Sequence, residues 1–172
     1  MNNRAFQDCY PEELSHCFGC GKNNAEGHQL KSYWDGDETI AHFLPESYHI
    51  AIPGFVYGGL IASLIDCHGT ASASAAACRA ASMEMGVEPN LRFVTGSLKV
   101  VYLAPTPLGV ELELRGVITE IKERKVIVDI SLSAEGRTCA KGQVVAVLMP
   151  ENMVTKSVSS QNIDANKRSC PA

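Results

Sequence analysis

Residues 58–83 read GGLIASLIDCHGTASASAAACRAASM, and this stretch predicts one long helix. It contains no proline and is crowded with alanine, the best helix former. Apolar side chains recur at the 3.6-residue spacing of a helix, in Leu60, Ile61, Leu64 and Ile65. Such a stripe is typical of a helix that faces a protein core. We therefore expect a buried helix here.

The sequence on both sides of this helix is rich in β-forming residues. Apolar side chains alternate with others in the run from Val126 to Leu132, and the turn signal Asp35-Gly36-Asp37 separates two shorter runs. Residues 45–53 are expected to form a loop. The predicted strands cover residues 29–34, 39–44, 90–103, 110–121, 125–134 and 138–148. Long strands behind one buried helix favour an α+β fold with an antiparallel sheet.

A chain of 172 residues suits a single domain, which we expect at residues 29–150. Residues 1–28 are polar and rich in cysteine and asparagine, and they predict an N-terminal arm with at most a short helix near residues 11–16. Residues 151–172 are rich in serine, asparagine and lysine, so we expect a disordered tail.

The overall charge limits the classes of partner. Fifteen lysines and arginines stand against nineteen acidic residues, a net charge of -4, which argues against binding nucleic acid or a membrane surface. No secretory signal or membrane span is readable, because the longest uncharged run is interrupted by proline and glycine. Seven cysteines, an odd number, favour reduced thiols and a cytoplasmic location.

Asp66 is the only aspartate, glutamate, lysine or arginine between Glu46 and Arg79, and it lies in the middle of the predicted helix. Burying a carboxylate costs several kcal/mol unless it is paired or neutralised. No basic side chain lies within helical reach, so Asp66 is a candidate for a perturbed pKa and for catalysis. The structural alternative is that Asp66 faces solvent or accepts a hydrogen bond from Thr70 one turn later.

Gly58 and Gly59 open the helix. Glycines at this position let a ligand approach the backbone N–H groups that have no partner within the helix. A polarised carbonyl oxygen can dock on such donors, as in an oxyanion hole. The alternative is that the glycine pair only permits a tight turn.

Three segments carry a family resemblance. Residues 56–66, VYGGLIASLID, resemble the His-Gly-Gly…Asp segment of hotdog-fold thioesterases of the phenylacetic-acid-degradation and 4-hydroxybenzoyl-CoA thioesterase group. Residues 17–21 (CFGCG) with 27–30 (GHQL) resemble an N-terminal signature of that group, and residues 98–105 (LKVVYLAP) resemble its central strand. The resemblance covers about residues 17–149.

The resemblance implies a hotdog fold, in which an antiparallel sheet of five or six strands wraps around one long central helix, assembled as dimers or tetramers. It implies hydrolysis of an acyl-CoA thioester without a metal or redox cofactor. Asp66 matches the catalytic carboxylate, acting as general base or nucleophile, and Gly58 matches the residue whose N–H polarises the carbonyl. Thr70 and Thr95 match hydroxyls that lie near the carboxylate or position water in some members.

The sequence departs from the family pattern at two places near the predicted site. Tyr57 replaces the usual histidine, and Ala51 or its neighbours stand where many members carry a catalytic-loop asparagine. We expect Tyr57 and Gly59 to contact the substrate. Four basic residues are candidates for the phosphates of coenzyme A, although each singly also fits a solvated strand end: Lys99, Arg124, Lys125 and Lys141.

Gly58 and Asp66 are eight residues apart, which is about 12 Å along a helix axis. One thioester carbonyl cannot contact both within a protomer. We therefore expect each site to combine Gly58 of one protomer with Asp66 of another.

Other motifs point to competing functions. The pair Cys17 and Cys20, with His16, His28 or Cys9, suggests zinc, but a four-coordinate site usually needs a second ligand pair, so packing of the arm is the default interpretation. Adjacent residues on a helix do not face each other, which argues against Asp66 pairing with its neighbours in a hydratase or dehydratase. A non-catalytic acyl-CoA-binding protein remains the alternative from a different class.

Overall fold

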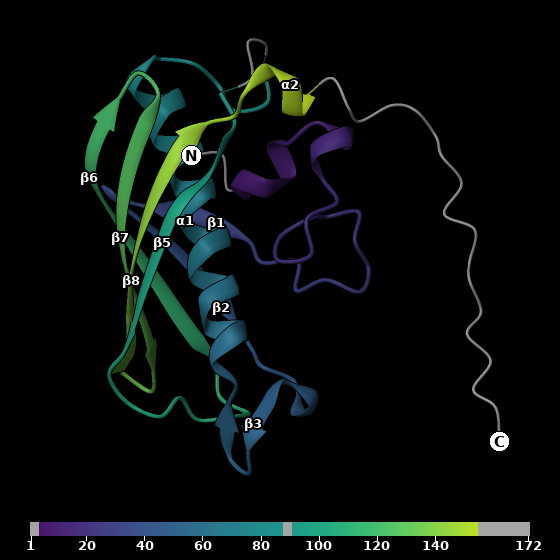
Figure 1. The fold of residues 1–172 in the computed structure, drawn as a ribbon, viewed down its shortest axis with the longest axis vertical. Coiled ribbons are helices and arrows are strands. Elements are labelled where there is room, and N and C mark those ends of the chain that lie inside the picture. Colours follow the sequence, from purple (N-terminus) through teal and green to yellow (C-terminus); the bar gives the residue numbers. More distant parts are fainter. Residues whose placement is uncertain (1–3, 88–90, 155–172) are drawn as a thin grey trace, which may run out of the picture.

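The computed structural model describes residues 4–87 and 91–154. One long helix, α1 (Gly58–Ala80), lies against one face of a six-stranded antiparallel sheet, and the N-terminal arm covers the side of α1 away from the long strands (Figure 1). This arrangement confirms the expected hotdog fold of the α+β class.

The sheet has the strand order β1-β2-β6-β7-β8-β5, and every neighbouring pair is antiparallel. Strand β5 is therefore an edge strand, although it lies in the middle of the sequence. The strands are β1 (Ser32–Asp35), β2 (Glu38–Phe43), β5 (Phe93–Tyr102), β6 (Leu112–Lys122), β7 (Lys125–Ala134) and β8 (Arg137–Leu148).

The predicted helix is three residues too long. Ser82 adopts a left-handed backbone with φ 54°, and the Met83 N–H bonds the Cys78 carbonyl at 2.9 Å, which closes the helix after Ala80. The expected loop at residues 45–53 is partly ordered as well. It contains the 3₁₀ helix η3 (Ser47–His49) and strand β3 (Ile50–Ile52), which pairs with β4 (Phe55–Val56) across Gly54, where φ is 88°.

The arm contains two 3₁₀ helices, η1 (Phe6–Cys9) and η2 (Glu12–Leu14), where the sequence predicts only one short helix. Residues 151–154 of the expected tail form the short helix α2 (Glu151–Val154), and residues 155–172 lie outside the described residues. None of the described helices has the length and apolar character needed to cross a bilayer.

The core lies between α1 and the inner face of the sheet. Gly69 allows a close approach of α1 to β8, because a Cβ at this position would lie 2.5 Å from a side-chain carbon of Val144. Burial of the apolar side chains is the main stabilising contribution to such a fold. The buried residues of this layer include Leu60, Ile61, Leu64, Ile65, Leu112, Leu114, Val126, Val128, Leu132 and Val144.

A buried polar network joins α1 to the sheet and the arm. His68 has no exposed surface; its Nδ1 lies 2.9 Å from Ser32 Oγ and its Nε2 lies 3.2 Å from Thr39 Oγ1. The Gln7 side chain donates to Ser32 Oγ at 2.9 Å. Burial lowers the pKa of His68 to about 4. The imidazole is therefore neutral at physiological pH and holds three segments together.

This network predicts a pH-dependent stability. Below pH 6.5 the unfolded chain binds a proton that folded His68 excludes down to about pH 4. The free energy of unfolding should therefore fall as the pH is lowered through this window, by up to about 3 kcal/mol. Urea denaturation at a series of pH values measures it. His68→Gln should flatten this pH dependence, and His16→Gln, at an exposed position, should retain it. A slope unchanged in His68→Gln would contradict the assignment.

Candidate functional site

Asp66 lies in the third turn of α1. It is partly buried, which is intermediate between the buried carboxylate and the solvent-facing carboxylate that the sequence left open. Thr95 of β5 donates a hydrogen bond to its carboxylate, from Oγ1 to Oδ1 at 2.5 Å. Burial raises the pKa of the Asp66 carboxyl above its usual range, and the bond from Thr95 opposes this shift. Among the described residues, no ion pair includes Asp66. A partly buried carboxylate that one hydroxyl orients is chemically able to act as a general base.

Thr70 lies one turn after Asp66 but does not contact the carboxylate. Its hydroxyl donates to the backbone carbonyls of Asp66, at 3.1 Å, and Cys67, at 3.3 Å. Thr70 is also buried. Of the two threonines that the sequence suggested, the structure therefore brings only Thr95 to the carboxylate.

The start of α1 is shaped by two tyrosines. Tyr57 occupies the N-cap position without a side-chain cap, and its ring packs so closely over Gly59 that a Cβ there would lie 2.4 Å away. The Tyr102 hydroxyl, on β5, donates to the Gly58 carbonyl at 2.8 Å. Close packing thus requires a glycine at position 59, and the first helical N–H groups have no side-chain cap.

Strand β5 connects the two halves of the site. Near its start Thr95 holds Asp66, and at its end Tyr102 holds Gly58. Gly58 and Asp66 remain two turns apart on the same helix, so one protomer does not bring them to a single carbonyl. The outer edge of β5 has no strand partner among the described residues, and Leu98 and Val101 are exposed on it.

Two of the four basic candidates, Lys99 and Lys141, lie on the outer side of the sheet. Lys99 and Lys141 line a groove of about 450 Å³ together with Arg115 and Asp129, and no residue of α1 lines it. Lys125 forms an ion pair with Glu120. Within one protomer the sheet separates Lys99 and Lys141 from Asp66.

An aromatic cavity beside the helix start was missed from the sequence. It has a volume of about 740 Å³, and Tyr57 lies at its wall. The His28 ring packs edge-on against Phe18, Phe43 and His49, with ring centroids 4.8, 5.6 and 5.3 Å away. Burial lowers the pKa of both histidines, which favours neutral rings. These residues come from distant segments, and no local pattern in the sequence links them.

One group among the described residues has the spacing of metal ligands: Cys17, Cys20 and Cys67. The sequence supplied only the first two. Cys67 joins them from α1, next to Asp66, whereas His16, His28 and Cys9 do not belong to the group.

The comparisons with known proteins agree with this architecture. The sequence pattern of the thioesterase superfamily matches residues 53–141. A solved thioesterase superfamily protein from Shewanella loihica PV-4 is 56% identical, covering 80% of this chain and 96% of that one, with a TM-score of 0.62. No protein of curated function matches the chain.

Two more distant structures share the fold. The E. coli PaaI protein, from the phenylacetic acid degradation operon, is 13% identical, with a TM-score of 0.58 over 72% of this chain and 81% of that one. A Streptococcus mutans protein bound to acetyl-CoA is 16% identical, with a TM-score of 0.56 over 70% and 88%.

The contact between Thr95 and Asp66 predicts how the carboxyl titrates. Carboxyl-detected NMR should show Asp66 titrating above the usual aspartate range. Thr95→Val should raise its pKa further, because the variant removes the hydrogen bond that lowers it. Ser97→Ala, in the same strand, should leave the titration unchanged. An Asp66 pKa that is unchanged or lowered in Thr95→Val would contradict the contact.

Proposed function

The chain belongs to the thioesterase superfamily, and on this basis we propose that it hydrolyses the thioester of an acyl- or aryl-CoA to the free acid and coenzyme A. The observation that carries the proposal is Asp66. It is the only charged residue in the middle of a core helix, its pKa is raised by burial, and a hydroxyl orients it. In a thioesterase, a partly buried carboxylate with a raised pKa, such as Asp66, is the expected catalytic group.

The proposed chemistry needs one base and one oxyanion site. The Asp66 carboxylate takes a proton from water as the water oxygen bonds to the thioester carbon. The carbonyl oxygen becomes an oxyanion, which the N–H at Gly58 stabilises. When the C–S bond breaks, the protonated Asp66 returns the proton to the leaving thiolate. The carboxylate is thereby restored, and coenzyme A leaves as a thiol.

The two groups meet if two copies pair along the free edge of β5. Thr95 marks the Asp66 end of this strand and Tyr102 marks the Gly58 end. Antiparallel pairing of two β5 strands, centred between Leu98 and Lys99, sets Thr95 of one copy opposite the partner's Tyr102. Each Asp66 then lies toward the partner's helix start. We propose a homodimer of this kind, or a tetramer built from it, as the active form.

The surroundings of Gly58 suggest where the substrate lies. Tyr57, which directly precedes Gly58, lines the aromatic cavity. This cavity is therefore the proposed site of the acyl group. Lys99 and Lys141, which line the groove on the outer face of the sheet, stay candidates for the phosphates of coenzyme A.

Two other functions fit the site less well. A hydratase needs an acid–base pair such as Asp–His, but His68 bonds Ser32 and Thr39 and does not face Asp66. A non-catalytic acyl-CoA-binding role draws support from Tyr57, which replaces the family histidine. It differs from the proposal in one measurable respect, the release of coenzyme A.

Asp66→Asn should fold normally and hydrolyse acyl-CoA at least about 100-fold more slowly, the scale of lost general-base catalysis. A panel of acyl- and aryl-CoA substrates with a thiol reagent measures the rate. Asp37→Asn, in the exposed turn between β1 and β2, should match the wild type. Wild-type turnover by folded Asp66→Asn would refute the role of Asp66, and binding without hydrolysis by the wild type would favour the non-catalytic alternative.

The shared site predicts rescue between two inactive variants. Asp66→Asn removes the base, and Gly58→Pro removes the backbone donor at the first helical position, where proline is well tolerated. In a random equal mixture half of the dimers are mixed, and each has one intact site. About a quarter of wild-type activity should return.

Gly58→Ala is the matched control, because it adds a Cβ but keeps the N–H. It should retain most of the activity, although the new Cβ would lie 3.2 Å from the Tyr102 hydroxyl. Circular dichroism checks that each variant folds, and native mass spectrometry checks that mixed dimers form. Mixed dimers without activity would overturn the interface model.

A further inference from the structure

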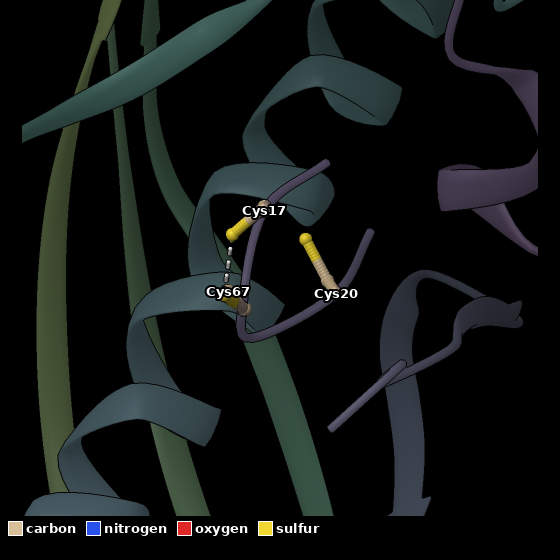
Figure 2. A group of neighbouring side chains, drawn as sticks. All are labelled: Cys17, Cys20 and Cys67. Carbon is tan, nitrogen blue, oxygen red and sulfur yellow. Dashed lines mark hydrogen bonds between the residues drawn. The ribbon is translucent and has the colours of Figure 1, made fainter. Parts of the chain in front are cut away.

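Three thiols from two distant segments meet beside α1. Cys17 and Cys20 lie in the turn that follows η2, and Cys67 lies on the helix. Their sulfur atoms all lie within 4.8 Å of one another, and those of Cys17 and Cys67 are 3.8 Å apart. Figure 2 shows the Cys17 side chain pointing toward Cys67 of α1, with the Cys20 side chain nearby on the same turn as Cys17. Cys20 and Cys67 are buried, and Cys17 is exposed.

Two glycines and one backbone hydrogen bond hold the turn against α1. Gly19 lies directly over Cys67, where a Cβ would lie 2.2 Å from its sulfur. Gly21 fits against the backbone of the same turn, where a Cβ would lie 2.5 Å from the Cys17 nitrogen. The Gly21 N–H bonds the Cys17 carbonyl at 2.7 Å. The two glycines and this bond therefore fix the thiols close to Cys67.

The spacing suits a tetrahedral metal ion. Zinc bound to thiolates has Zn–S distances near 2.3 Å, which places two sulfurs of a tetrahedron about 3.8 Å apart. The Cys17–Cys67 distance has this value without any movement. A disulfide requires sulfurs about 2.05 Å apart and leaves the third thiol unused. Three soft sulfur ligands favour Zn²⁺ over hard cations such as Mg²⁺.

We propose that Cys17, Cys20 and Cys67 bind one Zn²⁺ per chain, with water as the fourth ligand on the exposed side of Cys17. Each thiol releases one proton when the ion binds. The ion ties the arm to α1, and the arm supplies Phe18 and His28 to the aromatic cavity. The proposal does not depend on whether Asp66 is a catalytic base.

The test uses the full chain, reduced and stripped of metal. Titration with Zn²⁺ against a chromophoric chelator should show one tightly bound ion per chain, and Co²⁺ should give thiolate-to-metal charge-transfer absorption. Cys17→Ser, Cys20→Ser and Cys67→Ser should each weaken zinc binding at least about tenfold. Cys78→Ser is the matched control, because Cys78 is also a buried thiol of α1 but lies outside the group. It should bind zinc like the wild type.

Two further readouts separate the proposal from its alternatives. Zinc should protect Cys17, the exposed thiol of the group, from alkylation in the folded wild type, a result that does not depend on how the variants fold. Cys17→Ser changes an exposed residue, so it keeps the test valid if Cys67→Ser is unstable. Equal zinc binding by Cys17→Ser and Cys78→Ser would overturn the proposal. A folded, reduced wild type that binds no zinc would also overturn the proposal. This holds equally if the three cysteines instead form a disulfide on exposure to peroxide.

Discussion

The burial of α1 between the sheet and the arm is the constraint on which the structure depends. A helix covered on several sides can carry few polar groups, and each one needs a partner. His68 finds its partners in Ser32 and Thr39, whereas Asp66 receives one hydroxyl, from Thr95. His68 is thereby satisfied and inert, and Asp66 is left with a raised pKa. The same burial that stabilises the fold thus raises the pKa of the carboxyl that we propose as the catalytic base.

Strand β5 contacts both parts of the proposed site. It is an edge strand, and it holds both the Asp66 carboxylate and the helix start through Thr95 and Tyr102. Gly58 and Asp66 lie two turns apart on α1, and we therefore propose that a complete site needs two chains. The open edge offers a second copy a place to pair, and pairing in the antiparallel direction exchanges the two ends of the strand. The proposed catalytic unit and the proposed dimer therefore follow from one strand.

The helix and the six strands were predictable because their signals are local: an apolar stripe in residues 60–65 and alternation in β7. Asp66 was detectable as a lone charge directly after that stripe. The rest depends on contacts between distant segments. Thr70 follows Asp66 at helical spacing, yet its hydroxyl bonds the backbone, as buried threonines in helices often do. Likewise, nothing near residue 67 indicates that Cys17 and Cys20 lie against it, and only the sheet places Lys99 on the outer face.

The central claim is that Asp66 and the partner's helix start act on one thioester. A crystal structure with a non-hydrolysable acyl-CoA analogue, in which a methylene replaces the thioester sulfur and the carbonyl is kept, tests it most directly. We expect the carbonyl oxygen within hydrogen-bond distance of the Gly58 N–H of one protomer. The Asp66 carboxylate of the other protomer should lie beside the carbonyl carbon, with room for one water. An analogue bound with its carbonyl away from both groups, or with both supplied by one protomer, would contradict the account.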